Sequence, residues 1–325
     1  MHISPELQAL RSNDAPQRHT QSELLDLLRG WFGGQIATGV ESQFQRFAQG
    51  EALTELPALS QLFAPGQSHG SALVDDFTGC MLAFLRAQPL GMVPLRHRVD
   101  DFGAALVLCR SGGSALALHV AEGPALMRRP APLSVTFTPG ETHELVLAGA
   151  AKTSLVTLDQ DLPGRAELGI RQECIAAGDV MSRDGARECQ IVQSVSGALV
   201  SLKLQRRNQD GALTREFALD DGKFLRQAAG SPRETRLELA AALLGRMGRS
   251  DAAPLLAAIA QEEASQSLRW QALRECLGLE TSTGFSALCT IAEDAADPLS
   301  GPAGALRAQL LETYPVLQGI TECRV

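Results

Sequence analysis

The spacing of apolar residues changes twice along this 325-residue chain, and this change constrains the fold more than any other feature. Up to about Pro94, apolar residues recur every three or four positions, which is typical of helices buried along one face. They then alternate with a period of two, as in strands, until helical spacing returns at Pro232. The sequence predicts an α+β multidomain protein with an N-terminal arm and helical subdomain (1–91), a central antiparallel β-barrel or sandwich (92–229) and a C-terminal helical stack (230–325).

The N-terminal third is expected to form a small helical subdomain that packs on the segment after it. Residues 1–20 are polar and are broken by Pro16, so we expect a loose arm there. The first helix is expected to begin at Ser22 and to end at Gly33-Gly34, because Ser is a good N-cap and Gly a good terminator. Further helices are predicted at 41–49, 56–63 and 72–86.

The middle third reads as short strands separated by turns. The first strands are expected at 104–109, 114–120, 134–137, 144–147 and 154–158, and a further strand is expected at 198–204. Turns are expected at 111–113, at Pro139-Gly140, at Gly149, and at 183–185, 209–211 and 221–222. Short strands without long helices between them favour a barrel or a sandwich over a parallel α/β sheet.

The C-terminal third contains an internal repeat. Aligning Arg236 with Arg269 also aligns Leu244-Gly245 with Leu277-Gly278, a repeat of about 33 residues. Arg269-Trp270-Gln271-Ala272 resembles the start of the short HEAT-like repeats of the phycobilisome-lyase type. That resemblance implies stacked helix pairs that bind a protein partner. The alternative is a helical bundle without repeat geometry.

One segment of the β region resembles the second conserved motif of cupins. In Phe137-Thr138-Pro139-Gly140-Glu141-Thr142-His143, a Pro-Gly turn precedes a histidine, and Arg96-His97-Arg98 followed by Asp100 and Asp101 lies where the first cupin motif would lie. The chain departs from the cupin pattern at Val99, where the first motif has a second His, and at Leu147, where the second motif has Asn.

The cupin resemblance implies a metal site and a way to dimerise. Its candidate ligands are His97, His119 and His143 with Glu141 or Asp101, which could hold a divalent metal such as Fe, Mn, Zn or Ni. Pairing of cupin barrels through their sheets implies a homodimer. The alternatives are a cupin-like barrel without metal and, for His119, a hydrogen-bonded histidine of the core or rim.

Composition excludes several classes of partner and location. A net charge of −8 and a pI near 5.3 disfavour nucleic acid. No apolar run reaches about 18 residues, so no membrane span is expected. Seven cysteines, an odd number without a CxxC pair, indicate reduced thiols, and the first residues lack a signal peptide. We therefore expect a cytoplasmic protein.

Two functions fit these observations. The first is a non-catalytic accessory or regulatory protein, whose helices bind a protein partner and whose β domain binds a small molecule or dimerises; no cofactor is expected in this case. The alternative is a cupin-type metalloenzyme, an oxygenase or isomerase. The sequence has no nucleophile elbow, P-loop, dinucleotide fingerprint or HExxH motif, and it leaves open whether the protein is an enzyme.

Overall fold

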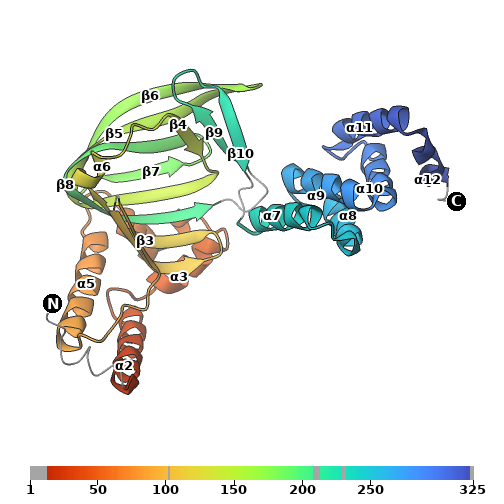
Figure 1. Ribbon diagram of the computed structural model, residues 1–325. Helices are drawn as coiled ribbons and strands as arrows, with labels where there is room; N and C mark the ends of the chain where they lie inside the picture. Colours follow the sequence, from red (N-terminus) through yellow and green to blue (C-terminus); the bar gives the residue numbers. More distant parts are fainter. Residues whose placement is uncertain (1–12, 102, 208–212, 229–231, 323–325) are drawn as a thin grey trace. The chain divides into compact units, whose positions relative to one another are not determined.

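The computed structural model describes residues 13–101, 103–207, 213–228 and 232–322 (Figure 1). The chain divides into two compact units. The first comprises Met1–Arg207 and Ala218–Lys223, and the second comprises Asn208–Phe217 and Phe224–Val325. The first unit contains the N-terminal helices and the large sheet, and the second contains the C-terminal helices.

Among the residues that the structure describes, four α-helices precede the sheet: α2 (Ala15–Phe32), α3 (Val40–Ala48), α4 (Pro57–Ser60) and α5 (His69–Ala87). The first of them begins earlier than predicted, because Pro16 lies in its first turn. Proline is tolerated there, since the first N–H groups of a helix have no partner within the helix. The expected loose arm is therefore wrong from Ala15 onward, and residues 1–12 of it lie outside the described residues.

In the middle of the chain, the described residues form a seven-stranded antiparallel sheet. Six of its strands follow the order β1-β2-β3-β8-β5-β6, and β7 lies off this path and pairs with β5. Its strands are β1 (His97–Asp100), β2 (Gly103–Ser111), β3 (Ser114–Glu122), β5 (Gly140–Leu162), β6 (Arg165–Ala176), β7 (Val180–Asp184) and β8 (Glu188–Arg207). The segment between β3 and β5 contains α6 (Gly123–Leu126) and β4 (Ser134–Phe137). Strands β9 (Thr214–Ala218) and β10 (Phe224–Ala228) form a hairpin after β8.

The predicted turns at 111–113, 183–185 and 221–222 join strands as expected, and the one at 209–211 lies outside the described residues. The predicted turn at Gly149 is wrong, because β5 runs unbroken through it. Gly149 has a φ of +86°, and the pairing of β5 with β8 shifts register on both sides of Ala148. It therefore serves a β-bulge, which bends a long strand without ending it.

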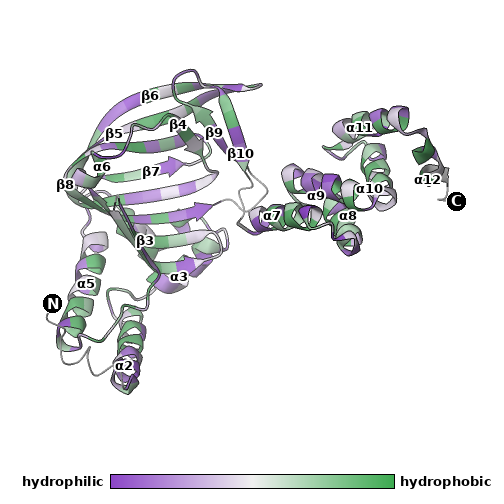
Figure 2. Cartoon of the chain, in the orientation of Figure 1, coloured by the Kyte–Doolittle hydropathy of each residue, from purple (hydrophilic) through white to green (hydrophobic). Residues whose placement is uncertain are grey.

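The N-terminal helices and one face of the sheet share a single core. Phe44, Phe47, Leu73 and Phe77 of the helices belong to the same buried cluster as strand residues Leu116, Leu118, Leu145, Leu202 and Leu204. Hydrophobic and hydrophilic segments alternate along the strands in Figure 2, as expected for a sheet with two different faces. We call the face carrying those strand leucines the helix-covered face, and the opposite one, carrying Glu144, Val146 and Ser201, the inner face.

The C-terminal part consists of paired helices around a second core. They are α7 (Pro232–Arg246), α8 (Ala253–Gln261), α9 (Gln266–Leu279), α10 (Thr281–Glu293), α11 (Ser300–Thr313) and α12 (Gln318–Glu322). Buried Leu256, Leu273, Phe285 and Leu288 lie in that core. The two aligned sequence copies thus each form a helix pair, while HEAT-like geometry stays a prediction. Among the described helices, none is both long and apolar enough to cross a lipid bilayer.

Candidate functional site

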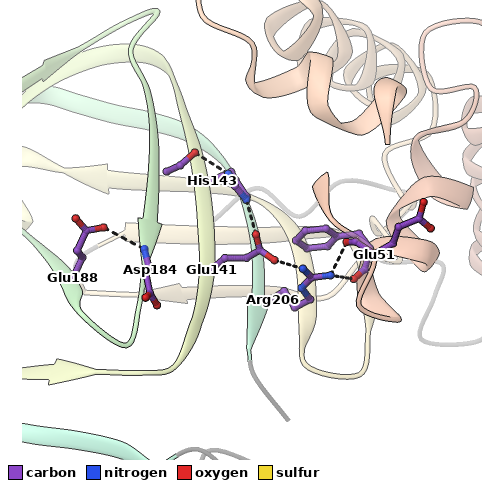
Figure 3. Close-up of polar contacts among 8 residues, drawn as sticks. Glu51, Glu141, His143, Asp184, Glu188 and Arg206 are labelled. Carbon is purple, nitrogen blue, oxygen red and sulfur yellow. Dashed lines mark hydrogen bonds and ion pairs between the residues drawn. The ribbon is translucent and has the colours of Figure 1, made fainter. Parts of the chain in front are cut away.

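The first half of β5 and the neighbouring β7 bring three polar side chains together on the helix-covered face (Figure 3). Nδ1 of His143 lies 2.8 Å from the Ser182 hydroxyl, and its Nε2 lies 3.0 Å from Oε2 of Glu141. The His143 side chain is only 14% exposed, and its ring contacts those of Phe47 and Phe63. Glu141 and His143 can lie together because alternate residues of a strand point to the same face.

Arg206 of β8 connects this group to the N-terminal helices. Its guanidinium forms an ion pair with Glu141 and donates hydrogen bonds to the backbone carbonyls of Phe47 (2.5 Å) and Glu51 (2.8 Å). It also lies over the Phe47 ring, 4.2 Å from the centroid. The hydrogen bond from His143 and the charge of Arg206 lower the pKa of Glu141 despite its partial burial. This arrangement holds the segment after α3 against the sheet.

The sequence predicted His97, His119, Glu141 and His143 as metal ligands, and the structure brings only the last two together. His97 lies on β1, four strands from β5 in the sheet order, which is roughly 19 Å at the usual strand spacing. Its Nδ1 lies 3.1 Å from the Leu95 carbonyl oxygen. His119 pairs with Ser201, which places its side chain on the inner face, opposite to that of His143.

This donor set does not fit one metal ion, because catalytic zinc sites use about three protein ligands around one point. Within the described ranges, there is no group of three or more His, Cys, Asp or Glu side chains that could hold a metal. Asp101, the alternative to Glu141, follows β1 and lies with His97 rather than with His143. Metal binding by this protein therefore stays a prediction.

The inner face carries a buried charged cluster that the sequence reading missed. The Glu144 carboxylate, 2% exposed, lies 2.5 Å from a guanidinium nitrogen of Arg183 and 3.1 Å from Nζ of Lys203. Burial alone would raise the pKa of Glu144, but the charges of Lys203 and Arg183 hold it below its ordinary value. The sequence signal for this cluster was a charged residue within each of two segments of alternating apolar residues, namely Glu144 and Lys203.

His119 lies beside this cluster on the same face. Burial, together with the charges of Lys203 and Arg98, lowers its pKa to about 4, against the opposing effect of Glu144. The ring is therefore neutral near pH 7. Among the described residues, neither of its ring nitrogens has a hydrogen-bond partner.

A cavity of about 860 Å³ lies elsewhere in the first unit, between the 126–136 segment and strands β5, β6 and β8. Its lining is mostly uncharged: Ala121, Leu126, Met127, Arg129, Pro130, Ala131, Pro132, Ser134, Val135, Thr136, Ser154, Val156, Ile170, Gln172, Cys189, Gln190, Ile191, Val192, Gln193 and Leu219. The Ser154 hydroxyl oxygen accepts hydrogen bonds from the side-chain amides of Gln172 (3.0 Å) and Gln193 (2.5 Å). Two donors on that oxygen leave the hydroxyl hydrogen free to be donated.

Comparison with known proteins gives no family assignment. No family model matches the chain, and no curated protein matches it. Similar solved structures include oxalate decarboxylase from Bacillus subtilis, with 17% identity over 37% of this chain and 29% of that chain at a TM-score of 0.25. The 7S globulin of Momordica charantia has 19% identity over 39% of this chain and 36% of its own, also at 0.25. A DMSP lyase from Ruegeria pomeroyi has 15% identity over 44% of this chain and 68% of its own, at a TM-score of 0.26.

The oxalate decarboxylase and the globulin are cupin-type proteins, and the likeness falls on the middle β region. The chain spans about a third of the length of each of these two proteins. At such TM-scores, function must be argued from this chain's own residues. Closure of the sheet into a barrel stays a prediction.

Proposed function

We propose that this chain is a non-catalytic accessory protein whose first unit binds a small uncharged molecule and whose C-terminal helices bind a protein partner. The observation that carries the proposal is the cavity of about 860 Å³ beside Ser154. Its volume falls within the range of roughly 300–1,000 Å³ that is usual for small-molecule sites. It also has the usual lining of such sites, apolar side chains with a few polar groups.

The lining determines the chemistry of the ligand. Arg129 is the charged residue among the lining side chains, whereas three glutamines and Ser154 supply uncharged donors and acceptors. Val156 and Ile170 supply apolar surface. A ligand with hydroxyl or amide groups and one apolar face would satisfy both, while a cationic ligand would lose its hydration without gaining a matched partner.

Filling the cavity without disturbing the core tests the proposal. Ile170 lines the cavity but is 54% exposed, so Ile170→Trp adds volume at the cavity while the strand can stay in place. The matched control is Leu162→Trp, an exposed position on β5 that does not line the cavity. The probes are uncharged nucleosides, monosaccharides and aromatic amides, screened by thermal shift and confirmed by calorimetry.

We expect at least one probe class to stabilise the wild-type protein and the Leu162→Trp control, and to lose at least about tenfold in affinity for Ile170→Trp. The proposal fails if no probe binds, or if the Ile170→Trp variant binds as tightly as the control.

The partner surface is proposed on α7. Leu239, Leu243 and Met247 are each more than half exposed, and they recur at intervals of four residues along and just beyond this helix. Residues at that spacing lie on one helical face, and contiguous exposed apolar patches often mark interaction sites.

We expect the double variant Leu239→Glu/Leu243→Glu to abolish recovery of a partner that the wild-type protein retains from its own cell extract. Leu255→Glu on α8, also an exposed leucine, should not abolish it.

The metalloenzyme alternative has one supporting observation, the proximity of Glu141 and His143. Elemental analysis of protein purified without chelator decides between the two functions. Near-stoichiometric Fe, Mn, Zn or Ni that is lost in His143→Ala would favour the enzyme, because removing one of few ligands removes most of a site.

A further inference from the structure

We infer that the inner face of the sheet holds a second binding site, for a small oxyanion such as a carboxylate or phosphate group, formed by Lys203, Arg183 and His119. This site shares no lining residue with the cavity beside Ser154. It is therefore a further activity of the same unit, independent of the proposed uncharged ligand.

The charge balance of the cluster is the first argument. Lys203 and Arg183 both pair with the single carboxylate of Glu144, which leaves one positive charge in excess. The two cationic side chains are only 24% and 11% exposed, so water screens that excess poorly. Lysine is rarely buried unless its charge is paired. An oxyanion would supply the missing negative charge.

The hydrogen-bonding capacity of the cluster is the second argument. A lysine ammonium has three donors and an arginine guanidinium five, and the pairing with Glu144 uses one of each. His119 adds a neutral ring without a partner among the described residues, and one of its nitrogens carries a hydrogen at neutral pH. Spare donors from three strands thus surround one place, which suits an anion with several oxygens.

The residues paired with these side chains on the adjacent strands are small. Ala117 lies directly across from Lys203 on β3, and Ala105 lies directly across from His119 on β2. Directly paired residues share a face, so both methyl groups lie on the inner face beside the longer side chains. The other charges on this face include Arg98 and Asp100 of β1, which pair with each other at 3.1 Å, and the exposed Arg110 and Arg207. Arg110 and Arg207 add no negative charge, so the excess positive charge at Lys203 and Arg183 stays uncompensated.

Direct titration tests the inference, with inorganic phosphate and malonate as separate probes on the full-length protein at pH 7. Comparison of the two titrations distinguishes a phosphate site from a carboxylate site. We expect saturable binding of at least one probe by calorimetry. Binding should be about tenfold weaker in Lys203→Met and nearly unchanged in Lys203→Arg, which keeps the charge. Lys152→Met is the matched control, because Lys152 is an exposed lysine on β5.

Two further readouts separate binding from a structural role of the cluster. Glu144→Gln removes the competing negative charge, so it should bind the anion more tightly than wild type, whereas a cluster that only holds the strands together would bind no better. Saturation with the anion should also raise the pKa of His119, followed by NMR of its ring, because a nearby negative charge favours the imidazolium.

The inference is overturned if neither anion binds saturably, if Lys203→Met binds as wild type does, or if Glu144→Gln binds more weakly. Melting curves of each variant confirm that it is folded before binding is compared.

Discussion

His119 makes the stability of the first unit depend on pH between about 4 and 6.5. Its pKa is lowered from 6.5 to about 4 in the folded state, so between these values the unfolded chain binds the proton and the folded one does not. The contribution of His119 to the free energy of unfolding is therefore fully present above pH 6.5. It is lost as the pH falls to 4, and it amounts to roughly 2–3 kcal/mol for this partly buried group.

We expect the His119→Gln variant to lose that part of the pH dependence, because glutamine does not titrate. Urea unfolding at a series of pH values measures it. His69→Gln, at an exposed position, is the control and should keep the wild-type slope. Equal slopes in wild type and His119→Gln would show that this ring is not held neutral by its surroundings.

Arg206 illustrates a residue whose shape matters as well as its charge. Its planar guanidinium reaches Glu141, two backbone carbonyls and the Phe47 ring at once, which an ammonium group cannot do. Arg206→Lys should lower the free energy of unfolding by about 1–3 kcal/mol. The same change at the exposed neighbour Arg207 should cost less than about 0.5 kcal/mol in chemical denaturation. Equal costs at the two positions would contradict the proposed connection between sheet and helices.

At the scale of elements, apolar periodicity predicted the kinds of structure well and their limits less well. The strand at 134–137 and the hairpin around Gly112 were predicted from alternation and a glycine turn. Gly149 was misread because a glycine with positive φ suits a turn and a bulge equally, and only pairing with β8 decides between them. Pro16 was misread because proline can start a helix as well as break one.

The bulge itself can be tested with two glycines that differ in their surroundings. Both Gly149 and Gly178 have positive φ, but a Cβ at Gly149 would lie 2.0 Å from the Ala198 carbonyl oxygen, whereas at Gly178 it would meet nothing within 4 Å. Gly178→Ala should cost only backbone strain, about 1–2 kcal/mol. Gly149→Ala should cost a further 1–3 kcal/mol or so, because the bulge must move. Similar midpoints in urea for the two variants would argue against the bulge.

At the scale of the whole molecule, the sequence predicted structure formed by residues that are close along the chain, but not contacts between distant residues. Glu144 meets Arg183 and Lys203 only because β7 and β8 both pair with β5, at separations of 39 and 59 residues. A single sequence does not reveal such pairings. For the same reason it showed neither the separation of His97 and His119 from His143 nor the cavity beside Ser154, which depends on how the 126–136 segment covers the strands.

The shared core of helices and sheet predicts an asymmetry between two truncations. Helix residues Phe44 and Phe77 and strand residues Leu116 and Leu202 lie in one buried cluster. Deleting residues 1–94 would expose the strand leucines of that cluster, at about 1.5–3 kcal/mol for each fully buried leucine, so we expect the product to aggregate or to lack a cooperative melting transition. Deleting residues 230–325 leaves that cluster complete, and the product should melt cooperatively within about 3 °C of one transition of the full chain. Differential scanning calorimetry of the three proteins measures this, and a cooperative transition in the chain without residues 1–94 would show that the sheet folds without the helices.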